Sequence, residues 1–137
     1  MAIGTTFRND ILKLVYNAVA IANLADNAAT SPITNLKVAL HTSDPNAGTQ
    51  ATSAAAYTGY AQVDVARTTG GWTVTGNSVS PVATITFPAG TGGGETVTHA
   101  SVGDGTKIYD SGALTPNITT GNGITPEIKT TSTITRT

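Results

Sequence analysis

The sequence predicts a mainly β fold: a single antiparallel β-sandwich or jelly-roll-like barrel with one N-terminal α-helix. Three observations support this prediction. Short runs alternate apolar and polar residues, turn-forming residues separate those runs, and only one segment has helical spacing. At 137 residues the chain is most economically one domain, with the helix over residues 5–26 and the β-sandwich over residues 33–137.

The N-terminal segment is the one good helical segment. Thr5 or Thr6 can cap it, and apolar residues recur along one face at helical spacing. That face comprises Phe7, Ile11, Leu14, Val15, Ala18 and Ala22. Further apolar residues at Leu12, Val19 and Ile21 widen it. Such a helix either packs on its own domain and on a neighbouring protein, or is buried in its own core; both readings stay open.

The rest of the chain alternates in the manner of β-strands. The predicted strands cover residues 36–42, 60–66, 71–75, 82–87, 95–102, 107–109 together with 118, and 124–135. Strong turn signals lie between them, including Asp44-Pro45-Asn46 and Gly76-Asn77. Residues 46–58 form a long uncharged connection, which predicts a functional or mobile segment that orders only against a neighbouring subunit.

Composition excludes several classes of function. Seven basic residues stand against eight acidic ones, for a net charge of -1, so no positive field is available for nucleic acid. The chain has no cysteine, which excludes disulfides and thiolate metal sites. No apolar run is long enough for a membrane span, and the N-terminus does not resemble a secretory signal. We expect a soluble protein made in the cytoplasm, with a neutral, threonine-rich surface suited to protein contacts.

The closest approach to catalytic chemistry is the run His41, Ser43 and Asp44. A triad needs a base that reaches the nucleophile and a third group behind that base. His41 and Ser43 share one face of a strand, whereas Asp44 begins an Asp-Pro-Asn turn. We therefore interpret this run as a strand and its turn.

Metal, phosphate and glycoside chemistry have equally weak support. The two histidines, His41 and His99, could in principle combine with Asp64, Asp104 or Asp110, but nothing in the spacing favours a metal site. The glycine-rich run 90–95 lacks the lysine and following helix of a phosphate loop, so its glycines are expected to serve a turn with positive φ. The acidic residues are too few for a glycosidase pair. We predict no cofactor and no enzymatic activity.

Several stretches together resemble a family of small structural proteins from tailed-bacteriophage virions, often described as tail fibre or minor structural proteins. They are LKVALHTSDPNAGTQ at residues 36–50, GYAQV at 59–63, ATITFPAGTGGGETVTHASVGD at 83–104 and IYDSGALTPN at 108–117. The resemblance spans roughly residues 33–118, and the threonine-rich C-terminus departs from the family pattern.

The resemblance implies a virion location and one of two roles. The first is a decoration (cement) protein that stabilises the major capsid lattice; the second is a tail or tail-fibre component close to host attachment. The sequence favours decoration, because the chain lacks the heptads or repeats of a fibre shaft. An enzyme of unrecognised type is a third, disfavoured hypothesis.

The expected partners are major capsid or tail proteins, together with further copies of the chain in a trimer or another symmetric homo-oligomer. No nucleic acid or membrane partner is expected. We predict apolar contacts at Phe7, Ile11, Leu14 and Val15. Residues 124–135 are expected to offer a strand edge, with contacts at Ile124, Ile128 and Ile134.

Overall fold

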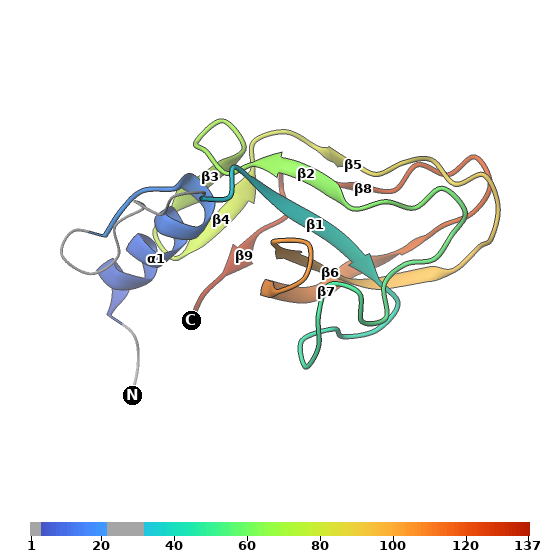
Figure 1. Ribbon diagram of the computed structural model, residues 1–137, viewed down its shortest axis with the longest axis horizontal. Helices are drawn as coiled ribbons and strands as arrows, with labels where there is room; N and C mark the ends of the chain where they lie inside the picture. The colour runs from blue at the N-terminus through green and yellow to red at the C-terminus, as the bar shows by residue number, and fades with distance from the viewer. Residues whose placement is uncertain (1–3, 22–31) are drawn as a thin grey trace. The chain divides into compact units, whose positions relative to one another are not determined.

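The computed structural model describes residues 4–21 and 32–137 (Figure 1). The chain divides into two compact units, each assembled from segments that are distant in sequence. Unit 1 comprises Met1–Asn35, Ala66–Thr84 and Lys129–Thr137, and unit 2 comprises Leu36–Val65 and Ile85–Ile128. The mainly β fold with one N-terminal helix is confirmed, and the sheets in the described part of the chain remain open rather than closing into a barrel.

Unit 1 places one helix against a small antiparallel sheet. The helix is α1 (Thr5–Asn17), and the sheet has the order β3-β4-β9. Its strands are β3 (Trp72–Thr75), β4 (Ser78–Pro81) and β9 (Ile134–Thr135). Leu12 and Tyr16, one helical turn apart, are fully buried, and the Tyr16 ring meets the ring of Trp72 edge-on at 4.9 Å. This apolar contact is the core of unit 1.

The helix ends earlier than the apolar pattern predicts. It stops at Asn17, because Ala18 adopts a left-handed conformation with φ 57° and the Val19 N–H bonds back to the Lys13 carbonyl at 3.1 Å. Residues 22–26 of the predicted helix lie outside the described residues. The expected threonine cap is also wrong: Gly4 occupies the N-cap position and no side chain caps the helix there.

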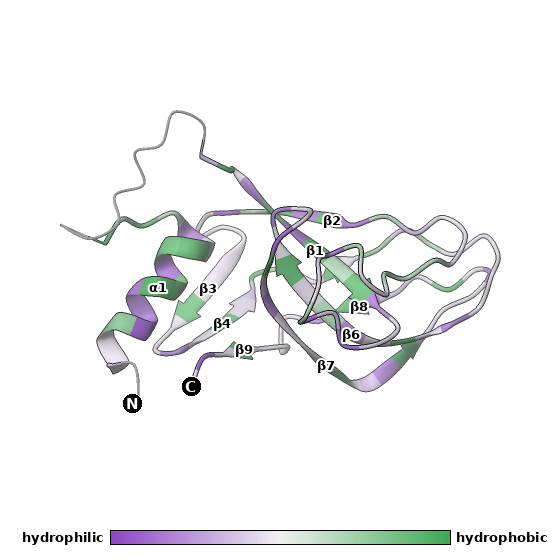
Figure 2. Ribbon diagram, turned by 60° about the horizontal axis from the view of Figure 1, so that its bottom comes forward, coloured by the Kyte–Doolittle hydropathy of each residue, from purple (hydrophilic) through white to green (hydrophobic). Residues whose placement is uncertain are grey.

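The inward face of α1 differs from the predicted one. Leu12 and Tyr16 point into unit 1, whereas the four residues predicted as contacts keep part of their surface exposed. Hydrophobic and hydrophilic residues alternate along the ribbon of α1 (Figure 2). The apolar side chains left partly exposed after burial of Leu12 and Tyr16 include the four that the sequence predicts as contact residues.

Unit 2 contains a four-stranded sheet in the order β2-β1-β6-β7 and a two-stranded sheet of β5 and β8. The strands are β1 (Asn35–His41), β2 (Val63–Ala66), β5 (Ile85–Thr86), β6 (Thr96–Gly103), β7 (Ile108–Thr119) and β8 (Glu127–Ile128). The pairs β1–β6, β6–β7 and β5–β8 are antiparallel. The core side chains include Leu36, Val38, Leu40, Tyr57, Ile85, Phe87, Val97, Val102 and Ile128.

Among the strands that depart from the sequence prediction, β7 and β4 do so for identifiable reasons. β7 is one long strand where two short ones are predicted, because a four-residue excursion, 114–117, interrupts its pairing with β6. The excursion contains Pro116, which an edge strand tolerates since its outer N–H groups need no partner. β4 is not predicted at all: with Val79 as its only aliphatic residue, it forms by pairing with β3 through the Gly76-Asn77 turn.

The connection 46–58 is folded onto its own unit, contrary to the prediction that it orders only against a neighbour. Gln50 is fully buried and its N–H bonds to the Thr106 carbonyl at 2.8 Å. The Ala55 N–H bonds to the Leu40 carbonyl at 2.8 Å, and Tyr57 lies in the core. Small uncharged residues here let the backbone approach β1 closely, so low bulk indicates packing rather than mobility.

Candidate functional site

The stretch after β1 forms the turn that its sequence predicts. The Asp44 Oδ1 atom accepts a hydrogen bond from the Asn46 N–H at 3.0 Å, while Asp44 itself is exposed. Ser43 is also exposed, and its hydroxyl is not the group that His41 contacts. The interpretation as a turn rather than a catalytic corner is therefore confirmed.

His41 instead belongs to a buried polar cluster that also contains Gln50 and Ser101. Nδ1 of His41 lies 2.9 Å from the Thr52 carbonyl oxygen, and Nε2 lies 2.8 Å from Ser101 Oγ. The Gln50 amide nitrogen bonds to Ser101 Oγ at 3.2 Å. His41 and Gln50 have no exposed surface, and Ser101 is only 1% exposed.

The donor and acceptor in each of these hydrogen bonds can be assigned from two groups whose roles are fixed: the Thr52 carbonyl, which only accepts, and the Gln50 amide nitrogen, which only donates. The Thr52 carbonyl can only accept, so His41 carries its proton on Nδ1. Nε2 then accepts from the Ser101 hydroxyl, whose oxygen in turn accepts from Gln50. Desolvation by burial lowers the pKa of His41 below its ordinary value of 6.5; the bond to Thr52 opposes this shift and neighbouring His99 adds to it. The cluster requires neutral histidine.

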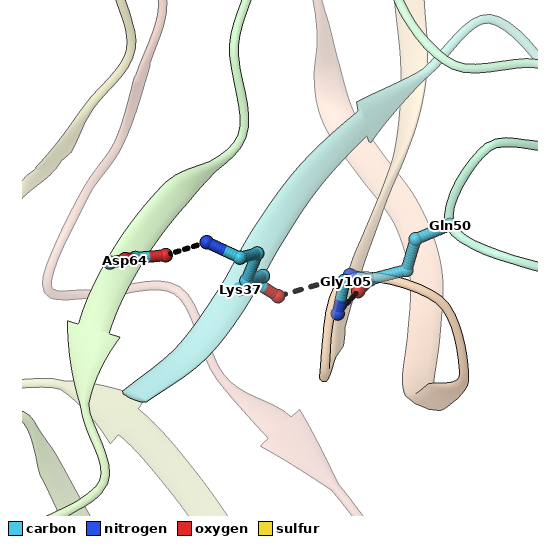
Figure 3. Close-up of polar contacts among 4 residues, drawn as sticks. All are labelled: Lys37, Gln50, Asp64 and Gly105. Atoms are coloured by element: carbon cyan, nitrogen blue, oxygen red, sulfur yellow. Dashed lines mark hydrogen bonds and ion pairs between the residues drawn. The ribbon is translucent and has the colours of Figure 1, made fainter. Parts of the chain in front are cut away.

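Gln50 also bonds to the backbone of Lys37 and Gly105 (Figure 3). Its amide nitrogen donates to the Lys37 carbonyl at 3.0 Å, and its Oε1 accepts from the Gly105 N–H at 2.7 Å. The Lys37 ammonium forms an ion pair with Asp64 on β2 (Figure 3). That pair is substantially exposed and contributes little to stability, whereas the buried bonds of Gln50 have no water to replace them.

His41 and Ser101 are in contact in this cluster, but their hydrogen bonds join parts of the fold rather than prepare a nucleophile. Ser101 has almost no exposed surface, so a substrate has no route to its hydroxyl. The nitrogen that would face a third catalytic group instead donates to a backbone carbonyl. Sequence reasoning missed Gln50 and Ser101, because 60 residues separate Ser101 from His41 and only strand pairing brings them together.

The two histidines meet, but the acidic residues proposed with them do not complete a metal site. His41 and His99 are paired across β1 and β6. Asp64 is paired with Lys37, and Asp104 accepts backbone N–H bonds from Thr106 and Lys107, which lower the pKa of Asp104. In residues 4–21 and 32–137 there is no group of three or more His, Asp or Glu side chains placed to hold a metal ion.

The glycine-rich run binds its own chain rather than a phosphate. Glu95 Oε1 accepts the backbone N–H groups of Ala56 and Tyr57 at 2.6 and 3.0 Å. Gly93 has φ +66°, which confirms the expected positive-φ turn. A Cβ on Gly90 would lie 2.2 Å from the Gly121 carbonyl oxygen, so this position also requires close backbone contact.

The predicted interface residues are placed in three different environments. Phe7 and Ile124 are each 40% exposed. The half-buried residues are Ile11, Leu14, Val15 and Ile134. Ile128 is a core residue, buried and paired with Ile85. The run 124–135 is not one free edge, since β8 pairs with β5 and β9 pairs with β4.

A further residue that sequence reasoning missed is Arg67. Its guanidinium donates to the carbonyls of Leu14 and Val15 in the last turn of α1, with the Nε–O distance to Val15 at 2.7 Å. It also donates to the Ile33 carbonyl, and it is only 8% exposed. The last carbonyls of a helix lack intrahelical partners and carry partial negative charge, so a buried guanidinium stabilises them. An isolated arginine in the sequence gives no signal for this role.

The described residues contain no helix long and apolar enough to cross a membrane.

Together, the buried histidine cluster, the self-bound glycine-rich loop and the arginine cap use polar side chains to hold the fold together.

Comparison with known proteins identifies the family of the chain. No curated protein matches the chain. The model of one family, described as podophage GP4 fiber I protein gp80, matches residues 4–135, nearly the whole chain. The match extends at both ends beyond the stretches that carry the resemblance in sequence. The chain therefore belongs to the podophage GP4 fiber I protein gp80 family, and its role in the phage particle is structural.

Proposed function

We propose that this protein is a structural component of a phage tail fibre that acts through protein–protein contacts. The observation that carries the proposal is the family match over residues 4–135, because the family is described as a fibre protein. This order of preference reverses the one drawn from sequence alone, which favoured capsid decoration from the absence of heptads and repeats.

The buried polar groups support a role without catalysis. In unit 2 the hydroxyl, imidazole and amide groups of Ser101, His41 and Gln50 bond to one another and to the backbone. A reactive centre needs a nucleophile that a substrate can reach, and Ser101 is sealed. We accordingly propose that the protein is not an enzyme.

The exposed apolar side chains of α1 support contacts with other virion proteins. Phe7 is 40% exposed, and Ile11, Leu14 and Val15 keep part of their surface open. Exposed apolar surface on a structural protein is typical of a protein-binding face. We propose these four residues, with Ile124 and Ile134, as contact residues, and we expect synthesis in the host cytoplasm before assembly into the virion.

Capsid decoration stays as the second candidate. The observation that favours it is the size of the elements: the helix has 13 residues and the longest strand 12, so the described chain has no extended shaft. A cement protein would use the same exposed side chains against the capsid lattice.

A phage that lacks the protein separates the two candidates. If the protein is a fibre component, particles without it will adsorb poorly to host cells while keeping the heat resistance of the complete capsid. Electron microscopy of complete particles labelled with an antibody against the chain should place the label on the tail. Normal adsorption with a heat-sensitive capsid would reject the fibre role and support decoration.

A further inference from the structure

Charge is divided unequally between the two units. Unit 1 has five basic residues against two acidic ones, a net charge of +3. Unit 2 has two basic residues against six acidic ones, a net charge of -4, and the two values add to the -1 of the whole chain. The residues of unit 1 are Arg8, Lys13, Arg67, Lys129 and Arg136 against Asp10 and Asp26; those of unit 2 are Lys37 and Lys107 against Asp44, Asp64, Glu95, Asp104, Asp110 and Glu127.

This separation is a product of the fold. Along the sequence the basic residues are scattered from Arg8 to Arg136, with no basic run. Unit 1 gathers the N-terminal, central and C-terminal segments of the chain, and with them five of the seven basic residues. Two units of opposite net charge on one chain are complementary between copies of that chain, although Arg67 itself is buried against α1 and contributes little to the accessible charge of unit 1.

Unit 1 also exposes more apolar surface than unit 2. Of the five large apolar residues exposed in the described part of the chain, four lie in unit 1: Phe7, Val19, Ile33 and Val82. Exposed apolar groups are a feature that a bound partner covers.

We propose that copies of this chain associate heterologously, with unit 1 of one copy bound to unit 2 of the next. Contact between two copies of unit 1 would oppose +3 with +3, and contact between two copies of unit 2 would oppose -4 with -4. Only the unlike pairing brings opposite charges together. A heterologous contact repeats from copy to copy and builds a ring or a filament.

This inference rests on the proposed structural role and identifies a second copy of the chain as the partner. Two other outcomes would contradict it. The opposite charges could attract within one chain, which would leave the protein monomeric at every concentration. Unit 1 could bind a different virion protein, which would likewise leave the isolated chain monomeric.

Sedimentation velocity of the full chain against concentration and NaCl concentration tests the contact. We expect association that grows with protein concentration and weakens between roughly 0.05 and 0.5 M NaCl, because salt shortens the range of charge interactions. A monomer of 13.8 kDa at every concentration and salt concentration would overturn the proposal. Association that salt leaves unchanged would also overturn it, since apolar contacts alone would then suffice.

Charge reversal in unit 1 tests which surface is used. Arg8→Glu with Lys13→Glu changes the charge of unit 1 from +3 to -1, because each reversal removes two positive charges. Self-association should weaken roughly tenfold, because a small number of ion pairs between unit 1 of one copy and unit 2 of the next would be lost. Lys13→Glu alone is the second variant if the double variant does not fold, as judged by circular dichroism. Lys107→Glu is the matched control: it reverses an exposed lysine of unit 2 and should not weaken association.

A mixture of variant and wild type distinguishes heterologous from symmetric contact. The double variant keeps an unchanged unit 2, so a fluorescently labelled variant should bind wild-type protein about as tightly as wild type binds itself. In a symmetric contact through unit 1, the mixture would be weakened instead, and that result would overturn the proposal. The location of the protein on the particle is a separate measurement, so failure of this contact leaves the fibre role to be judged by the labelling experiment.

Discussion

At the scale of single residues, burial decides what each polar side chain does. His41 lies beside a serine and an aspartate in sequence, yet its partners are Thr52 and Ser101. Arg67, an isolated basic residue in sequence, is buried against the C-terminal end of α1. Each of these side chains forms hydrogen bonds with polar atoms that water cannot reach. Leaving one such atom without a hydrogen bond would lower the free energy of unfolding by about 1–3 kcal/mol.

The state of His41 gives a pH prediction. Burial lowers the pKa of His41 in the folded protein below its ordinary 6.5. Below about pH 6.5 the unfolded chain therefore binds a proton that the folded chain does not. The free energy of unfolding should fall as the pH is lowered through this range, until the lowered pKa is reached. Urea unfolding from pH 7.5 to 5 measures the change.

Two variants identify the residue responsible. His41→Gln should flatten this pH dependence while lowering stability overall, since glutamine does not titrate. His99→Gln should leave most of the pH dependence in place, because the burial of His41, the main cause of its lowered pKa, is unchanged. An unaltered slope in His41→Gln would assign the effect to other groups.

At the scale of elements, backbone contact determines which segments pair. Gly103 is the last residue of β6, before the turn to β7, and a Cβ there would lie 2.0 Å from the Lys107 carbonyl oxygen. The same Cβ would lie 2.8 Å from Gln50 Oε1, within the polar cluster. Gly103 thus allows both the turn and the buried amide to occupy the same end of the hairpin.

Gly103→Ala should destabilise the protein by at least about 2 kcal/mol, because backbone and a buried amide must both shift. Gly112→Ala, in the partner strand β7, is the matched control: a Cβ there would meet no atom within 4 Å. Its effect should stay within about 0.5 kcal/mol. Urea unfolding of both variants measures the difference. Equal destabilisation of the two would contradict the proposed contact at Gly103.

At the scale of the whole molecule, the chain passes between the two units at Asn35/Leu36, Val65/Ala66, Thr84/Ile85 and Ile128/Lys129. Neither unit is a continuous piece of sequence. Segments that leave a unit and return must be ordered together for that unit to fold, which raises the entropic cost of folding one unit alone. We therefore propose that the chain is one cooperative domain.

Cooperativity can be tested with a probe inside one unit. Trp72 is the only tryptophan and is buried in unit 1, so its fluorescence follows that unit, whereas far-ultraviolet circular dichroism follows the strands of both. For one cooperative domain the two urea transitions should coincide. Different midpoints would show two separately folding units and would make the single-domain prediction wrong.

By itself the sequence determined the β class, the N-terminal helix, the β1 and β6 strands, the Asp44 turn and the family. The structural features among these depend on preferences acting over a few neighbouring residues, such as alternation along a strand or the restricted φ of a proline, whereas the family was indicated by the order of several stretches along the chain. Local preference placed most elements correctly but gave them inexact ends, as the early stop of α1 at Asn17 shows.

Tertiary structure alone decided which distant residues meet. It joined His41 to Ser101 across β1 and β6, set Arg67 against the last turn of α1, and gathered five of the seven basic residues into unit 1. It also folded the neutral segment 46–58 onto β1 and buried Ile128. The physical reason is that burial and strand pairing are properties of three-dimensional packing, which residues close in sequence do not specify.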